Sequence, residues 1–259
     1  MLRNTYRNFL ALCLCCVTAA AQPVPQPLPE QPLPEHPVKR YATDLAPSAD
    51  LLYRIKAQQS GFSLSGNAKV AWRAQDREYS ISTQTEAAIL GRILEADSSG
   101  EIDTFGLAPL QSTEKRFRKP RTTTHFNRQD KTIRFTESEL SYPLQGGEQD
   151  RTSAIWQLVA VARAAPNKFK AGSQWRFFVA GQRDAQAWSF KVIGKEAIDT
   201  PLGTLQAMHV LKAPPPDSKE QQLDIWLAPT RDWYPVRLRF SEADNDSIEQ
   251  TLERIDRIN

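Results

Sequence analysis

Hydrophobic and polar residues alternate along most of the chain after Asp50, as they do in β-strands that bury one face. In the first such run Leu51, Tyr53 and Ile55 share one parity, with mostly polar residues between them. Later runs follow at short intervals: Phe62 to Trp72, Tyr79 to Thr85, Ile133 to Phe135, Trp175 to Val179, Trp188 to Val192, Leu223 to Leu227 and Val236 to Phe240. Many short amphipathic strands predict a mainly β fold, either a curved antiparallel sheet (a half-barrel) or a sandwich.

One segment breaks the alternation and predicts a single packed helix. Between Asp150 and Ala165 the apolar residues recur at helical spacing, at Ile155, Leu158, Val159 and Ala162. Asp150 is a suitable N-cap, and Pro166 would end the helix. The last stretch, Ser247 to Ile258, fits either a helix or a final strand.

The first 21 residues have the three parts of a secretory signal peptide. Arg3 and Arg7 precede a short apolar run, Phe9 to Val17, and Ala19-Ala20-Ala21 before Gln22 is a cleavage site of the A-x-A type. The apolar run is shorter than the roughly 20 residues that span a bilayer. We therefore expect cleavage between Ala21 and Gln22 and export to the periplasm.

The positions of the cysteines remove several chemistries. All three cysteines, Cys13, Cys15 and Cys16, lie inside the expected signal peptide. The mature chain would then contain no disulfide, no thiol nucleophile and no cysteine metal site. Lipid attachment at Cys16 is an alternative, but Cys15 stands where a small residue normally precedes the modified cysteine. We therefore expect no lipid anchor.

A proline-rich stretch separates the signal peptide from the strands. Residues 22–37 contain seven prolines, which exclude helix and central strand and favour an extended conformation. A ligand for a proline-recognising module is one interpretation, and a stiff spacer is the more common one. The expected organisation is a disordered linker over 22–48 and a single β-rich domain over 49–259.

Charge and motif content argue against several classes of function. The formal net charge of +3 falls to 31 − 30 = +1 once Arg3 and Arg7 leave with the signal peptide, which does not suit a nucleic-acid binder. The three histidines lack metal-ligand spacing. His209 with Asp224 could form a base and its orienting carboxylate, but no nucleophile motif accompanies them. We expect no catalytic residue, no metal site and no cofactor.

Two groups of residues are candidates for ligand binding. A basic stretch opens with Lys115, Arg116 and Arg118 and could face anionic groups, although we favour its interpretation as the solvated face of two strands. Indoles can line an apolar cavity, and Trp156, Trp188 and Trp226 are the candidates that we select from six tryptophans. Such indoles more often fill a core.

The second half of the chain contains four short motifs in a characteristic order: Asp150-x-x-Ser153, Gly194-Lys195-Glu196 followed by Thr200-Pro201-Leu202-Gly203-Thr204, Trp226-Leu227 and Pro235-Val236. In these motifs the chain resembles the bacterial family of exported proteins known as domain of unknown function 3108. The resemblance runs from about Tyr53 to Leu252 and implies an exported β-rich protein of no established activity. The layout is also distantly similar to lipoprotein carriers of the LolA and LolB type, whose curved sheets hold acyl chains against helices.

The sequence therefore favours a non-catalytic periplasmic protein that binds or carries an amphipathic envelope ligand, either a lipid or an acidic glycan. A structural or protein-interaction module of the cell envelope is the alternative. A hydrolase of envelope polymers ranks below both, because no set of residues amounts to an active site. Expected partners are a lipid or anionic ligand and an envelope protein, not nucleic acid, and no transmembrane segment is expected in the mature chain.

Overall fold

The computed structural model describes residues 36–59, 61–213, 221–242 and 246–258. The expected signal peptide, its cleavage site and most of the proline-rich stretch lie outside these ranges. The strands in the described part are β1 (Ala49–Gln59), β2 (Phe62–Gln75), β3 (Glu78–Ala87), β4 (Gly91–Asp103), β5 (Gly106–Arg116), β6 (Arg121–Asn127), β7 (Thr132–Phe135), β8 (Ser141–Pro143), β9 (Gln149–Asp150), β10 (Gln174–Ala180), β11 (Ala185–Thr200), β12 (Gly203–Lys212), β13 (Gln222–Leu227), β14 (Pro235–Ser241) and β15 (Ser247–Arg257). The helices are α1 (Arg151–Ala164) and the short 3₁₀ helix η1 (Pro229–Arg231).

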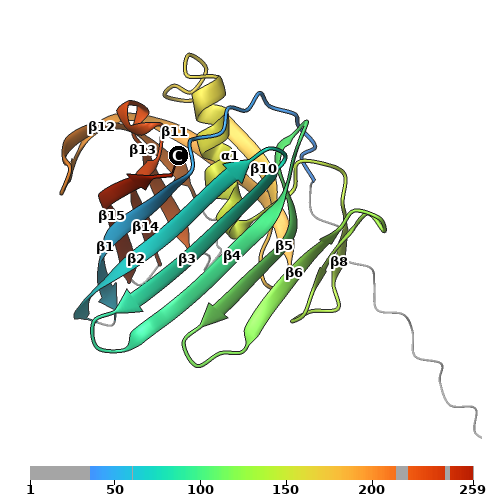
Figure 1. The fold of residues 1–259 in the computed structure, drawn as a ribbon, viewed down its shortest axis with the longest axis horizontal. Helices are drawn as coiled ribbons and strands as arrows, with labels where there is room; N and C mark the ends of the chain where they lie inside the picture. The colour runs from blue at the N-terminus through green and yellow to red at the C-terminus, as the bar shows by residue number, and fades with distance from the viewer. Residues whose placement is uncertain (1–35, 60, 214–220, 243–245, 259) are drawn as a thin grey trace, which may run out of the picture. The chain divides into compact units, whose positions relative to one another are not determined.

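All of these strands belong to one curved sheet (Figure 1). Their order is β8-β7-β6-β5-β4-β3-β2-β1-β15-β14-β13-β12-β11-β10-β9, and every pair is antiparallel except β9 with β10. The alternating runs of the sequence are the strands, because Leu51, Tyr53 and Ile55 of β1 all point into the core. The predicted mainly β fold with one helix is confirmed as a curved sheet that is not closed into a barrel.

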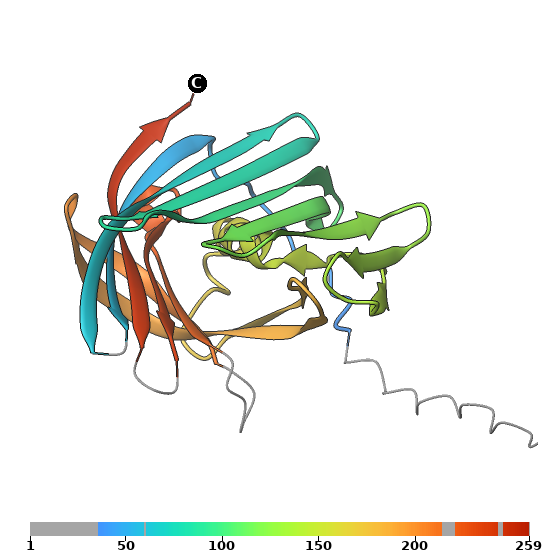
Figure 2. The same cartoon turned by 90° about the horizontal axis from the view of Figure 1, so that it is seen from below.

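Helix α1 lies against the concave side of this sheet, between its two halves (Figure 2). It begins where predicted, because the Asp150 carboxylate accepts the backbone N–H of Ser153 at 2.9 Å and the Ser153 hydroxyl accepts the N–H of Asp150 at 2.9 Å. This reciprocal cap satisfies two donors at the helix start. The Trp156 ring stacks on Trp72 of β2 with centroids 4.4 Å apart and meets Tyr234 edge-on at 6.1 Å.

The two ends of the sheet face each other across a second, smaller apolar cluster. Its buried members come from strands at both ends of the order: Phe126, Ile133, Phe135, Tyr142, Phe178, Ala180 and Ala185. Gln157 of α1 closes one side, since its amide donates to the carbonyl of Phe105 at 2.6 Å and accepts the N–H of Leu107 at 2.9 Å. These two bonds attach α1, which directly follows β9 at one end of the sheet, to the β4–β5 turn and the start of β5 in the other half.

The chain is already packed before the first strand, which corrects the expected end of the linker. Within the described residues, 36–48 run along α1 and β10 rather than standing free. The Asp44 N–H donates to the carbonyl of Ala160 at 3.0 Å, and the Trp72 indole donates to the carbonyl of Ala46 at 2.9 Å. Ala46 is 4% exposed. The prediction of a disordered linker up to residue 48 is thus wrong for 36–48, which contain only two prolines, Pro37 and Pro47.

The ambiguous C-terminal stretch is strand β15, which lies between β1 and β14. Two ladders account for this choice, since residues from Ser247 to Arg257 pair with β1 while Ser247 to Thr251 also pair with β14. The Thr200–Gly203 segment forms the predicted turn, with Gly203 at φ +96°. In the ranges that the structure describes, none of the helices has the length and apolar character needed to cross a bilayer.

Candidate functional site

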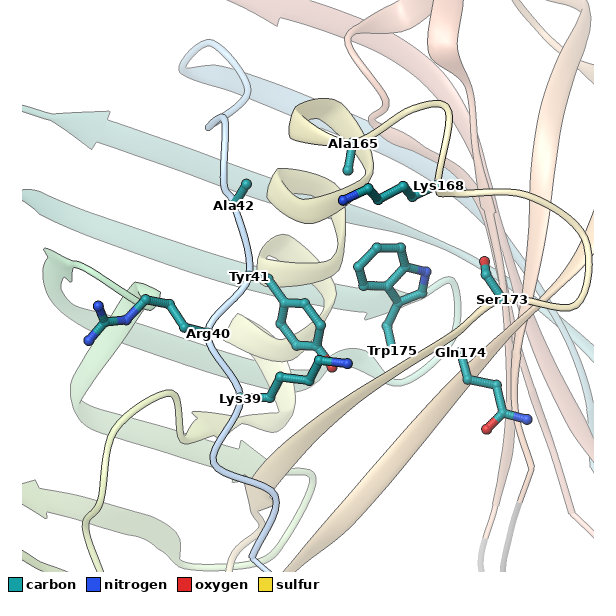
Figure 3. A pocket seen from close by; sticks show the side chains of 9 residues that line it. All are labelled: Lys39, Arg40, Tyr41, Ala42, Ala165, Lys168, Ser173, Gln174 and Trp175. Atoms are coloured by element: carbon teal, nitrogen blue, oxygen red, sulfur yellow. The ribbon is translucent and has the colours of Figure 1, made fainter.

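A solvent-open pocket of about 410 Å³ lies where the N-terminal segment passes the end of α1 and the start of β10 (Figure 3). Its volume falls in the range of small-molecule sites, about 300–1,000 Å³. Nine residues line it: Lys39, Arg40, Tyr41, Ala42, Ala165, Lys168, Ser173, Gln174 and Trp175. They come from two parts of the chain that are far apart in the sequence, 39–42 and 165–175.

The end of α1 determines one wall of the pocket. Pro166 cannot continue the helix, and a tight turn follows, in which the N–H groups of Lys168 and Phe169 donate to the carbonyl of Ala165 at 2.9 and 3.0 Å. The chain then returns to the sheet as β10, and Trp175 is the first residue of that strand to point into the core. Phe169 stacks on the Trp175 ring with centroids 5.7 Å apart, and this contact fixes the position of the indole.

Tyr41 provides the opposite wall and attaches the N-terminal segment to β10. Its hydroxyl accepts the backbone N–H of Arg176 at 3.2 Å and donates to the carbonyl of the same residue at 3.5 Å. The Tyr41 ring meets Trp175 edge-on at 5.2 Å and Phe177 at 5.9 Å. Two aromatic rings are therefore fixed at an angle to each other, and they form an apolar surface beside the pocket.

Two lysine amines stand at the rim of this apolar surface. Lys39 and Lys168 are both exposed, and among the described residues neither has a carboxylate partner. The Lys39 amine lies 5.2 Å from the centre of the Tyr41 ring, within cation–π range. Arg40 turns the other way and places its guanidinium 4.8 Å from the Phe105 ring (Figure 3). The rim beside Tyr41 and Trp175 is thus cationic.

The inner wall holds two buried polar atoms that have no hydrogen-bond partner within the described ranges: the Trp175 indole Nε1 and the Ser173 hydroxyl. Trp175 is 8% exposed and carries its N–H on the side of Ser173 in Figure 3. A buried donor without a partner costs about 1–3 kcal/mol. An acceptor that reached these atoms would recover part of that cost. Aromatic walls, a cationic rim and two orphaned donors suit an amphipathic anion, and nothing in the set is a nucleophile next to a base.

The three selected tryptophans do not gather at this pocket or with one another. Trp156 is part of the core between Trp72 and Tyr234. Trp188 of β11 packs edge-on against Phe190 at 6.0 Å and has the Lys212 amine 4.8 Å from its ring centre. Trp226 of β13 stacks on His209 with centroids 4.5 Å apart. None of these indoles lines the pocket, and a ligand role for them stays a prediction.

The three selected basic residues lie at a hairpin, away from the pocket. Lys115 and Arg116 end β5, and Arg118 is in the turn that leads to β6. Lys115 donates to the carbonyl of Lys119 at 2.6 Å, and Arg116 forms an ion pair with Glu114. Arg118 has a positive φ of 55° and lies over the Phe117 ring at 4.9 Å. They are solvated hairpin residues, and binding of an anion there is untested.

His209 has two carboxylate partners, one for each ring nitrogen. Nε2 is 2.7 Å from Asp224 Oδ1, and Nδ1 is 2.8 Å from Glu196 Oε1. Glu196 also accepts the Trp226 indole N–H at 2.8 Å. Partial burial alone would lower the pKa of His209, but the hydrogen bonds with Asp224 and Glu196 together raise it. The arrangement is that of a clamped imidazolium, and both nitrogens are already engaged, so neither is available as a general base.

This clamp explains two of the motifs that carry the family resemblance. Glu196 comes from the Gly194-Lys195-Glu196 motif on β11 and Trp226 from the Trp226-Leu227 motif on β13, and His209 on β12 lies between them. A third motif, Asp150-x-x-Ser153, is the cap of α1. These motifs therefore stabilise the fold, and the pocket is made by other residues.

Sequence reasoning missed most of the pocket because its N-terminal wall was assigned to the linker. A signal was present: residues 38–46 contain no proline, and they include the large apolar side chains of Tyr41 and Leu45. Both side chains pack against the main core. Trp175 was identified as a strand residue, but its partner Tyr41 is 134 positions away, and periodicity alone cannot pair such residues.

Among the solved structures similar to this chain, one shares its fold. A β-barrel-like protein of domain of unknown function DUF1849 from Brucella abortus overlaps with a TM-score of 0.58 at 13% identity, covering 84% of this chain and 100% of that chain. A putative outer membrane lipoprotein-sorting protein domain from Vibrio parahaemolyticus gives a TM-score of 0.30 at 8% identity, covering 81% and 84%. The lipoprotein LppX of Mycobacterium tuberculosis gives 0.28 at 10%, covering 83% and 89%.

No curated protein matches the chain. The model of the family "Protein of unknown function (DUF3108)" matches residues 52–253, which include β2 to β14, all of α1 and most of β1 and β15. This is the family and nearly the range that the motifs indicated. The chain belongs to the DUF3108 family.

Proposed function

We propose that this protein is an exported, non-catalytic binding or carrier protein of the bacterial cell envelope, and that its ligand is an amphipathic anion. The observation that carries the proposal is the pocket between Tyr41 and Trp175, in which aromatic walls adjoin two unpaired lysine amines. The apolar part of the ligand would lie against the rings, and its acidic group would face Lys39 and Lys168. A lipid with an acidic head group fits this division better than a glycan, which has few apolar groups.

The energetics of such a complex are modest and testable. Burial of each CH₂ group contributes about 0.8 kcal/mol, so six buried methylenes give roughly 5 kcal/mol before the costs of association. An ion pair at an exposed amine adds at most about 1 kcal/mol. Together these terms give about 6 kcal/mol, so we expect dissociation constants no tighter than roughly 4 × 10⁻⁵ M, between about 10⁻⁴ and 10⁻³ M once the costs of association are included, and weaker binding at high salt.

Calorimetric titration with dodecanoate and with the neutral amphiphile dodecyl maltoside tests the proposal. Both should bind, dodecanoate more tightly. Lys39→Glu with Lys168→Glu should weaken dodecanoate about tenfold and leave the maltoside within about twofold, because only the head-group attraction is reversed. Ala42→Phe, which places a ring at the mouth of the pocket, should weaken both.

A matched charge reversal elsewhere provides the control. Lys131→Glu with Lys195→Glu changes the net charge by the same amount at two exposed positions outside the pocket. It should leave both affinities unchanged. If neither amphiphile binds below millimolar concentration, the carrier proposal is wrong, and the alternative of an envelope interaction module becomes the better explanation.

A further inference from the structure

The molecule has a second unusual surface at the tips of two neighbouring hairpins. The first tip is the β3–β4 turn, Ala88-Ile89-Leu90, and the second is the β5–β6 turn, Phe117 to Pro120. We call them together the hairpin edge. In Figure 1 this edge lies at the lower end of the sheet, whereas the end of α1 and the N-terminal segment that form the pocket lie at the upper end.

Large apolar side chains at the hairpin edge point into solvent. Ile89 is 87% exposed, Leu90 is 49% exposed and Phe117 is 38% exposed. Tight turns are normally built from Gly, Asn, Asp, Ser or Pro, each of which has a conformational reason to be there. An aliphatic pair at the tip of a turn has no such reason and adds apolar surface to water. Exposed apolar groups that cluster in this way mark contact sites.

The ladders place the two tips next to each other. Leu94 of β4 pairs with Arg116 of β5, and the Phe117 N–H donates to the carbonyl of Ile93 at 2.8 Å. The turn that carries Leu90 is therefore adjacent to the turn that carries Phe117. Phe62, which begins β2, adds a further apolar side chain at the same end of the sheet and is 72% exposed.

The same edge is strongly basic. Residues 86–95 and 114–121 contain six cations and three carboxylates, 6 − 3 = +3, which equals the formal net charge of the entire chain. The carboxylates form ion pairs within the edge, among them Glu95 with Arg92 and Arg121, and Glu114 with Arg116. Arg118 and Lys119 have no carboxylate partner among the described residues. Two exposed glutamates in the next loop, Glu137 and Glu139, limit the basic zone on that side.

We propose that the hairpin edge docks the protein on an anionic lipid bilayer. Apolar side chains at the tips would enter the interface, and the cations behind them would face acidic head groups. This is the combination that gives reversible membrane association, because apolar burial and electrostatic attraction add. A protein partner would have to supply both a dense acidic surface and an apolar socket for both tips. A bilayer with acidic lipids supplies both everywhere.

The proposal uses no residue of the pocket and stands whether or not the pocket binds a ligand. Its test is sedimentation of the exported chain with vesicles of phosphatidylcholine alone or with about 30% phosphatidylglycerol. We expect binding to the acidic vesicles only, decreasing as salt increases. Ile89→Ser with Leu90→Ser, and separately Arg118→Glu with Lys119→Glu, should each weaken binding about tenfold or more.

Two controls separate this edge from the rest of the surface. Ile258→Ser removes an apolar side chain of comparable exposure, 45%, at the end of β15, and Lys131→Glu with Lys195→Glu removes the same charge elsewhere. Both should bind like the parent chain. The proposal is overturned if acidic vesicles do not bind the parent, if the edge variants bind as well as the controls, or if the edge instead mediates a dimer that Ile89→Ser with Leu90→Ser dissociates.

Discussion

Replacement of His209 by glutamine should destabilise the fold, and the effect should depend on pH in a direction that the structure specifies. The imidazole lies between Asp224 and Glu196, and its side chain is 15% exposed, against 10% for Asp224 and 42% for Glu196. Removal of one partner from a buried charge pair costs about 3–5 kcal/mol. Because the Glu196 side chain is 42% exposed, we expect a smaller loss, about 2–3 kcal/mol in the free energy of unfolding near pH 6.

The direction of this pH dependence follows from the pKa shifts of His209 and Asp224. Since the pKa of His209 is raised above its ordinary value of 6.5, the stabilisation is complete below about that pH and is lost as pH rises through the raised pKa. Burial would raise the pKa of Asp224, but its hydrogen bonds with His209 and Gln222 and the nearby positive charges together lower it, so the carboxylate remains charged in mildly acidic solution. The difference between parent and variant should therefore be largest near pH 5–6 and fall to about 1 kcal/mol near pH 9.

Urea unfolding of the parent, His209→Gln and His125→Gln, followed by circular dichroism at these pH values, measures the difference directly. His125 is exposed on β6 and serves as the matched control. A penalty for His209→Gln that is the same at both pH values, or that grows toward alkaline pH, would refute the clamped imidazolium.

Three further outcomes are expected. Asp150→Ala should lower the free energy of unfolding in urea by about 2–4 kcal/mol, because it removes the cap of α1 and the Asp150 Oδ2 acceptor that lies 2.5 Å from the buried Ser98 hydroxyl. Asp150→Asn should cost less. Gly66→Ala should cost about 2–3 kcal/mol, because the new Cβ would lie 2.2 Å from the Glu86 carbonyl oxygen, whereas Gly194→Ala meets nothing within 4 Å and should be neutral. Deletion of residues 22–45 should lower the melting temperature by about 5 °C, since Tyr41 and the Asp44 N–H lose their contacts, and deletion of 22–35 should not.

Local pattern predicted the strands and the helix because each is determined by neighbours in the sequence. Leu51, Tyr53 and Ile55 are buried because the strand period places them on one face, and Asp150 caps α1 because a short acidic side chain reaches the N–H groups two and three residues ahead. The choice of strand for Ser247 to Arg257 depended instead on β1, about 200 residues earlier, whose free edge only this segment fills.

The candidate site was beyond sequence reasoning for the same reason. Its two walls meet through the hydroxyl of Tyr41 and the backbone of Arg176, which are 135 positions apart. The seven prolines of 22–37 also led to the prediction that the linker continues to residue 48, although the adjoining residues 38–46 contain no proline. The basic stretch was found correctly as a sequence feature, and the structure adds what periodicity could not: its position beside the exposed Ile89 and Leu90.

The central claim is that an amphipathic anion occupies the pocket between Tyr41 and Trp175, and photolabelling locates such a ligand most directly. Dodecanoate with a diazirine on its chain would be bound at a concentration near its dissociation constant, irradiated and mapped by mass spectrometry of proteolytic peptides. We predict labels concentrated in residues 39–42 and 165–175, competed by unlabelled dodecanoate and lost in Ala42→Phe. Labels spread over the surface, or concentrated at Lys115 to Arg118, would contradict the account.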